Sequence, residues 1–355
     1  MRRIRLMFMR QACIRRRSRK ISNEQLIPLA ESGVTDVLLS SNVNHSDADA
    51  PDPRQPLVGQ WRQHPVAQIL VFVGISTAIL LALGLPLLAL FWLVHLHIDP
   101  NSERGGLAVE FFLAVSAVLC YALMTRREGR TLTDAGLPVR GFFSETAIGL
   151  MIGGGVFSAI IGMMGAFKLY HMGSVNTHFR PLLPLALFLC IAVFQETAVR
   201  GCIFQTLERR YGSGTALIAS SLFFGLLHLG SPVEKLSTAQ WLIGPLFLSF
   251  ETGLLFTAAY LLTRRLWLPI GLHWGWNFFE ASIYGTANSG AWENDPNTLF
   301  AGHTHGPFLL TGSTFGPEAS LFGLFIGSYA GLLLLRLAIR RGQWRTANFA
   351  AHQVE

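Results

Sequence analysis

The sequence predicts an all-α polytopic membrane protein with about eight transmembrane helices. Of its 355 residues, 51% are hydrophobic and only 14% are charged, and the mean hydropathy is +0.41. Several apolar runs reach the roughly 20 residues that cross a hydrocarbon core about 30 Å thick. The basic residues also alternate in number from one loop to the next. Together these observations favour a multi-pass membrane fold over a soluble one.

The apolar runs define the expected helices. We expect transmembrane spans at roughly 67–97, 107–124, 142–164, 182–200, 214–229, 241–262, 267–283 and 321–338. The first is long and contains Gly84 and Pro86, which we expect to break it. The fifth and seventh are short for a membrane crossing.

The distribution of Lys and Arg predicts the orientation. The second, fourth and sixth connections carry four, three and two basic residues, and the C-terminal tail carries three. The first, third, fifth and seventh carry one, two, one and none. Because cytoplasmic loops are enriched in Lys and Arg, we expect both termini to be cytoplasmic.

Four segments follow from this pattern. We expect a disordered basic and polar cytoplasmic tail at 1–60, two N-terminal transmembrane helices with a basic loop at 61–140, a core at 141–338 that carries the polar motifs, and a cytoplasmic tail at 339–355. Nine basic residues lie in the first twenty, and the rest of the chain has 19 basic against 21 acidic residues, so no nucleic-acid surface is expected. The basic start fits a positive-inside anchor, an organelle transit peptide or a start codon placed upstream of the true one. The four scattered cysteines indicate neither a disulfide framework nor a cysteine metal site.

Polar side chains stand in three neighbouring apolar spans. Glu196 and Arg200 are four residues apart and can pair on one helix face, His228 ends a span, and His273 and Asn277 share a helix face. Taken singly, these are explained by an ion pair, a histidine bonded to the backbone, and hydrogen bonding between helices. Their coincidence favours one buried polar site. By residue count, however, Glu196 is expected near the cytoplasmic end of its span and His228 nearer the external side.

These residue types are suited to hydrolysis by an activated water. A carboxylate with a histidine can act as general base, and a second histidine with an amide can stabilise an oxyanion. No serine elbow, Cys–His pair or phosphate-binding glycine loop is seen in the sequence. As an alternative, Glu196, His228 and His273 could bind Zn²⁺ and leave a position open for water, although no HExxH motif is present. No other cofactor is expected.

The three motifs resemble those of the CPBP membrane proteases, the CAAX-protease and bacteriocin-processing group also called the Abi family. That family has Glu-Glu-x-x-x-Arg, Phe-x-x-x-His and His-x-x-x-Asn. This chain has Gln195 to Arg200, Phe224 to His228, and His273 to Asn277 in the same order, and the resemblance covers roughly 140–338. It implies that the first motif supplies the base with His228, and that His273 and Asn277 form the oxyanion site. Metal dependence of the family has been argued both ways.

One departure bears on activity, because Gln195 stands where the family has its first glutamate. An amide cannot act as a base, and residues 195 and 196 point about 100° apart on a helix. Either Glu196 acts in a shifted register, or the protein binds without cutting. Glu280, on the face of His273 and Asn277, is a further candidate carboxylate, or else a solvated residue near the outer interface. Glu251 is a buried acid with no assigned role beyond hydrogen bonding between helices.

We therefore expect an integral, multi-pass intramembrane endopeptidase, placed in the inner membrane of a bacterium. Its partners would be membrane lipid and a membrane-anchored peptide or protein, such as a lipidated CAAX-like peptide, cut by water that Glu and His activate. The alternative, motivated by Gln195, is a non-catalytic member that binds peptides or acts as an immunity or scaffold protein. A transporter is the third hypothesis, but the sequence lacks the two related halves with broken helices that it would need.

Overall fold

The computed structural model describes residues 64–93, 102–231, 236–291 and 295–347. The predicted tail at 1–60 and the last eight residues of the predicted C-terminal tail lie outside these ranges. The described chain is helical apart from two short strands, and six of its helical segments are long and apolar enough to cross a membrane. The prediction of an all-α polytopic membrane protein is confirmed.

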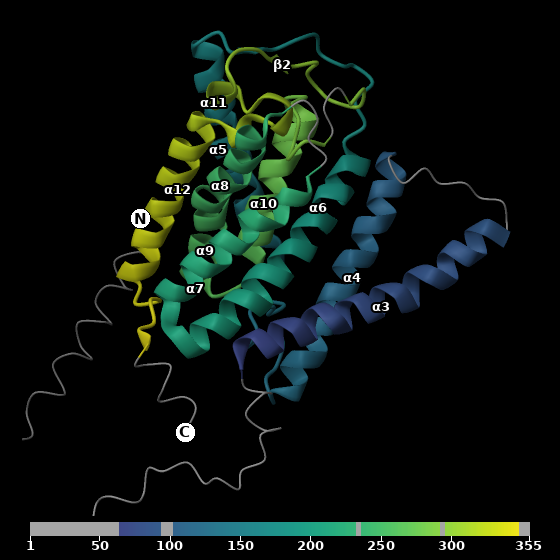
Figure 1. Cartoon of the computed structure of the whole chain (residues 1–355), viewed down its shortest axis with the longest axis vertical. Coiled ribbons are helices and arrows are strands. Elements are labelled where there is room, and N and C mark those ends of the chain that lie inside the picture. Colours follow the sequence, from purple (N-terminus) through teal and green to yellow (C-terminus); the bar gives the residue numbers. More distant parts are fainter. Residues whose placement is uncertain (1–63, 94–101, 232–235, 292–294, 348–355) are drawn as a thin grey trace, which may run out of the picture. The chain divides into compact units, whose positions relative to one another are not determined.

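The long helices follow the predicted spans closely (Figure 1). They are α3 (Pro65–Leu93), α4 (Glu103–Arg127), α5 (Phe142–Ala166), α6 (Leu182–Glu196), α7 (Gln205–Leu227), α8 (Thr238–Phe250), α9 (Thr252–Thr263), α10 (Trp267–Asn277) and α12 (Leu321–Arg340). The shorter elements are the π-helices η1 (Thr197–Phe204) and η3 (Phe278–Ile283), the 3₁₀-helices η2 (His228–Gly230), η4 (Ser313–Phe315) and η5 (Pro317–Ala319), and α11 (Phe308–Thr311).

Two predicted boundaries are corrected. Helix α3 runs on through Gly84 and Pro86 instead of breaking there, which membrane helices tolerate. The predicted fourth and fifth spans are joined in one helical run, Leu182–Gly230, because η1 links α6 directly to α7. The predicted seventh span is the run of α10 and η3, which is too short to be one of the six.

The long run bends back at Gly212. This residue has a φ of +79°, and a Cβ there would meet the backbone N of Ala347 at 2.9 Å. Only glycine suits both the conformation and the close approach. Glu196 precedes the bend by 16 residues and His228 follows it by 16, so the two arms bring them to a similar depth. The expected mismatch in depth was wrong because the first arm extends well beyond residue 200.

Helix α10 is held in close contact with α5 by glycines on both helices. A Cβ at Gly153 of α5 would lie 2.0 Å from the carbonyl oxygen of Leu272, and one at Gly275 of α10 would lie 2.1 Å from that of Leu150. Small residues four apart let membrane helices approach closely, as in the GxxxG pattern. This contact fixes the position of α10, which carries His273 and Asn277.

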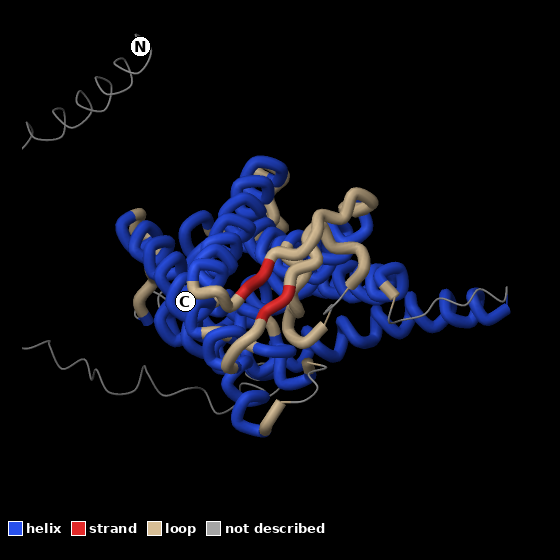
Figure 2. Tube along the Cα trace, turned by 90° about the horizontal axis from the view of Figure 1, so that it is seen from above, coloured by secondary structure: helices blue, strands red, loops and turns tan. Residues whose placement is uncertain are grey.

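Loops and a small sheet lie over one end of the helices (Figure 2). Strand β1 (Tyr170–His171) pairs antiparallel with β2 (His303–Thr304), and the hydroxyl of Tyr170 donates to the carbonyl of Tyr284. Burial raises the pKa of Tyr170. These contacts join the loop after α5 to the segment between α10 and α12.

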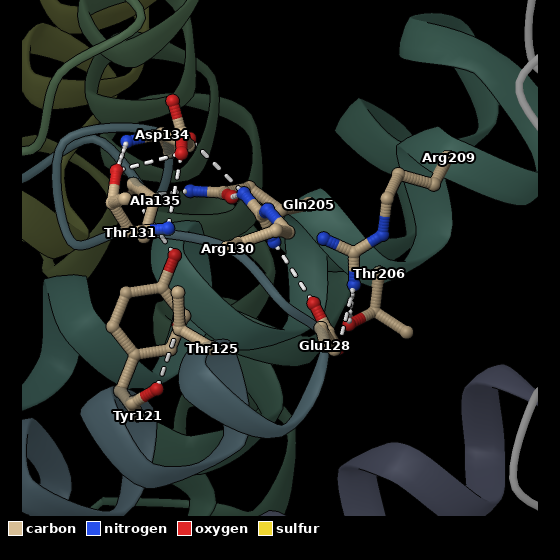
Figure 3. A network of polar contacts seen from close by, with 10 residues as sticks. All are labelled: Tyr121, Thr125, Glu128, Arg130, Thr131, Asp134, Ala135, Gln205, Thr206 and Arg209. Atoms are coloured by element: carbon tan, nitrogen blue, oxygen red, sulfur yellow. Dashed lines mark hydrogen bonds and ion pairs between the residues drawn. The ribbon is translucent and has the colours of Figure 1, made fainter.

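A polar network ties the loop after α4 to α7 at the other end of the helices (Figure 3). Arg130 bonds Glu128 at 3.0 Å and the side-chain oxygen of Gln205 at 2.9 Å, and Gln205 in turn donates to the carbonyl of Ala135. Arg209 of α7 reaches Glu128 at 3.3 Å. Hydrogen bonds between side chains thus hold the predicted basic loop against the start of α7.

Candidate active site

The three sequence motifs meet at a cavity of about 320 Å³ between α4, α6, the end of α7 and α10. Four of the six predicted site residues line it: Gln195, His228, His273 and Asn277. Glu196 and Arg200 do not line it and are fully buried. The two neighbours at 195 and 196 therefore face different surroundings, as the 100° step along a helix predicts.

Glu196 joins the first motif to the third. Its Oε1 accepts hydrogen bonds from Arg200 Nη1 and from His273 Nδ1, each at 2.9 Å. Since a carboxylate only accepts, the Nδ1 of His273 carries a proton. Glu196 thus orients the imidazole of His273 through Nδ1, which leaves the other ring nitrogen, Nε2, without a role in this contact.

Arg200 pairs with Glu196 inside an apolar part of the protein. Its Nη2 donates to the carbonyl of Gly253 at 3.1 Å, and its guanidinium lies 4.7 Å from the ring centre of Phe224 and 5.4 Å from that of Phe256. Burying an ion pair is tolerated when further hydrogen bonds and aromatic faces replace water. Phe256 also stacks on His273 at 4.7 Å, so one ring packs against both Arg200 and His273.

His228 is held in one tautomer by the backbone. Its Nδ1 lies 2.8 Å from the carbonyl oxygen of Phe224, which can only accept, so Nδ1 is the donor. In the neutral ring, Nε2 then carries a lone pair that can accept a proton. His228 begins η2, where the helix narrows and ends, and this places it at the cavity wall.

Asn277 is oriented by a residue that the motifs do not include. Asn288, in the loop after η3, donates from Nδ2 to Asn277 Oδ1 at 3.3 Å and to Glu280 Oε2 at 2.8 Å. With its oxygen engaged, Asn277 has its amide N–H groups left to donate into the cavity. The expectation of a solvated Glu280 was wrong: it is fully buried, lies outside the cavity lining and anchors Asn288.

Glu251 is also fully buried, at the junction of α8 and α9. Neither of its carboxylate oxygens has a hydrogen-bond partner among the described residues. It packs against Gly323 and Gly327 of α12, where a Cβ would crowd it. No contact in the described structure gives it a part in the site.

Sequence reasoning missed several polar residues that line the cavity, of which three matter here. They are Glu110 of α4, Asn288, and Glu318 of η5, whose Oε1 accepts from the backbone N and the hydroxyl of Ser289, both at 2.6 Å. Burial raises the pKa of Glu318. Glu110 could have been found, because a carboxylate inside an apolar span is a functional signal in itself. Asn288 and Glu318 lie in the segment between η3 and α12, which gives no such signal.

The predicted zinc ligands are not arranged as a metal site. Glu196 already binds Arg200 and His273, and it lies outside the cavity lining to which His228 and His273 belong. Among the residues that the structure describes, no three His, Cys, Asp or Glu side chains converge as a bound ion would need. We therefore derive no step through a metal ion.

The fold and the cavity define a helical membrane protein with a polar site between its helices. Residues 176–279 match the family model described as type II CAAX prenyl endopeptidase Rce1-like. This match supports the resemblance to the CPBP group of CAAX proteases that the three motifs predicted. The searches of curated proteins and of solved structures found no match.

Proposed function

We propose that this protein is an intramembrane endopeptidase that hydrolyses a membrane-anchored peptide, such as a lipidated CAAX-like peptide. The observation that carries the proposal is the cavity of about 320 Å³ lined jointly by Gln195, His228, His273 and Asn277. These side chains come from all three motifs and from helices far apart in sequence. The match to the CAAX protease family supports the same class of substrate.

His228 is the general base of the proposed reaction. Its Nε2 takes a proton from water, and the hydroxide adds to the carbonyl carbon of the scissile amide. His273, through Nε2–H, and Asn277, through its amide, donate to the oxyanion. The C–N bond then breaks, His228 returns the proton to the leaving nitrogen, and the products are an acid and an amine. Glu196 stabilises the positive charge on His273 and touches no reacting atom.

Gln195 fits this scheme as a ligand of the water, not as a base. Its side-chain oxygen is buried and has no hydrogen-bond partner among the described residues. An amide oxygen can accept from a water and align it, but cannot remove its proton. We therefore expect turnover to be slow.

The membrane setting belongs to the same proposal. We propose that both termini are cytoplasmic, that the protein lies in a bacterial inner membrane, and that 1–60 is a basic tail. The core at 141–338 would carry the activity, with lipid around α3 and α12. Six apolar helices support the membrane location.

The test is cleavage of a panel of quenched peptides, prenylated ones included, by purified protein in detergent. We expect the wild type to cleave at least one peptide and His228→Ala to lose the activity. His305→Ala is the matched control, because His305 lies in the loop after β2 and is not a lining residue of the cavity. Equal cleavage by wild type and His228→Ala would contradict the proposal.

The zinc alternative has its own test. Because Glu196, His228 and His273 do not converge, we expect dialysis against a strong chelator to leave cleavage unchanged. Loss of activity on chelation, restored by Zn²⁺, would replace the proposed base with a metal-bound water.

A second candidate function is favoured by one observation, the amide at position 195. A non-catalytic member would bind the peptide in the same cavity and release it intact. If the wild type cleaves no peptide and Gln195→Glu does, the protein is a non-catalytic member, because the rest of the site is then able to support cleavage.

A further inference from the structure

One acidic residue of the cavity has no part in the scheme above. Glu110 lies in α4, which packs along α6, and it lines the cavity with Ile191 and Gln195 of that helix. Its Oε2 is buried and has no hydrogen-bond partner among the described residues. A buried carboxylate without a partner is costly, so an ionised Glu110 calls for a donor or cation from a ligand.

The charged residues that line the cavity indicate the sign of the charge that a ligand would carry. Its lining includes two glutamates, Glu110 and Glu318, and no Lys or Arg among the residues described. Glu318 is engaged by Ser289, and Arg200, behind the wall, is paired with Glu196. Glu110 is thus the carboxylate left to recognise something that enters.

A second cavity differs from the motif cavity in the charges of its lining and in the state of its glutamate. It lies at the loops near the start of α4 and α6, and Arg104 and Arg180 are part of its lining. Its glutamate, Glu103, is satisfied by Asn297, whose amide lies 3.1 Å from Oε1. Two glutamates seven apart on α4 therefore differ: Glu103 is paired, and Glu110 lines the motif cavity and has a buried oxygen without a partner among the described residues.

We propose that Glu110 forms a subsite for a basic side chain of the peptide substrate, lysine or arginine, next to the scissile bond. The proposal rests on the proposed function, since it assigns a substrate class to the same cavity. Helix α4 lies outside residues 176–279 that the family model matches, so this preference belongs to the chain's own N-terminal helices. A partly buried charge-assisted pair gives on the order of tenfold in affinity.

The experiment compares peptides that differ in one side chain. A lysine is moved through the positions on either side of the scissile bond, and each peptide is paired with its norleucine and glutamate counterparts. Binding is measured by fluorescence anisotropy to full-length His228→Ala protein, which does not cut, and cleavage is measured with the otherwise wild-type chain. We expect lysine at one position to lower Kd and KM about tenfold relative to norleucine, with kcat nearly unchanged.

Glu110→Gln, made in both backgrounds, should abolish the difference between lysine and norleucine and leave norleucine binding unchanged. Glu103→Gln on the same helix is the matched control and should keep the difference. If lysine and norleucine bind equally to the unmodified cavity, the subsite is overturned while cleavage can still support the protease. A uniform fall in kcat for all peptides in Glu110→Gln also overturns it, because that result marks a catalytic carboxylate. If the protein binds lysine peptides more tightly but the wild type cleaves none, the subsite is supported and only the proposed protease activity is contradicted.

Discussion

Two groups of glutamate–arginine pairs in this protein lie in very different surroundings. The pair Glu196–Arg200 lies behind the cavity with neither side chain exposed. The pairs of Glu128 with Arg130 and Arg209 lie in the network of Figure 3, where the three side chains are 25% to 33% exposed. The distances are similar, 2.9 Å against 3.0 and 3.3 Å.

Although their distances are similar, the buried pair and the exposed pairs should differ greatly in what their loss costs. Water can take the place of either partner in the exposed pairs, whereas nothing replaces Arg200 beside a carboxylate that no solvent reaches. The buried pair also positions His273, so its loss should affect both the stability and the chemistry. The exposed network should only fasten a loop.

The largest effect is expected for Arg200→Met, because it leaves Glu196 charged and buried. We expect a loss of about 3–5 kcal/mol in the free energy of unfolding, measured by denaturant titration in detergent. Glu196→Gln with Arg200→Met should be less destabilised than the sum of the single variants, since no lone charge remains. A loss below about 1 kcal/mol for Arg200→Met would mean that water reaches the pair after all.

An intermediate effect is expected for Asn288→Ala, which removes a buried neutral donor. Asn277 Oδ1 and Glu280 Oε2 would both lose a hydrogen bond, at a cost of about 1–3 kcal/mol. Cleavage should also fall, because the Asn277 amide is no longer held. Asn176→Ala, which removes exposed hydrogen bonds to the carbonyl of Pro296 and from the backbone N of His178, is the matched control with a smaller cost. Equal losses in the two variants would contradict the comparison.

A small effect is expected for Glu128→Gln in the exposed network. The change removes the charge from both pairs and should cost about 0–1 kcal/mol, less at high salt, by the same denaturant titration. Cleavage should be unchanged. A cost as large as that of Arg200→Met would show that the network, and not the buried pair, holds the helices together.

The smallest effect is expected for Asp134, beside the same network. Hydrogen bonds from the hydroxyl and backbone N of Thr131 hold its pKa below the usual value. The pKa of the folded state lies below that of the unfolded state, so this contribution is present at neutral pH and is lost as pH falls through the depressed pKa. The melting temperature of Asp134→Asn should therefore lie closer to that of the wild type in acid than at neutral pH. A gap that widens in acid would contradict this assignment.

Sequence reasoning predicted the fold class and the convergence of the three motifs, because hydropathy and helix periodicity are local signals. It failed at Gly212 and at the depth of Glu196 and His228, since the π-helix η1 joins two spans without a polar break. It also missed the GxxxG contacts of α5 with α10, although Gly149 and Gly153 show that spacing.

Within the site, the motifs named the helical residues and left out the loops. Asn288 and Glu318 act through contacts that only the tertiary structure creates. Glu196 was predicted as a catalytic base, and we now propose a positioning role for it, because its carboxylate is bonded to Arg200 and His273. A single sequence cannot say which of two adjacent polar residues faces a cavity when the helix around them is locally distorted.

The most direct test of the account is the initial cleavage rate of Gln195→Glu against wild type and His228→Ala on one peptide. The account predicts that Gln195→Glu is faster than wild type by on the order of 10²-fold, because a carboxylate at that wall of the cavity adds a base beside His228. It predicts that His228→Ala is silent. A rate for Gln195→Glu no higher than wild type, with His228→Ala still active, would show that the cavity is not where the water is activated.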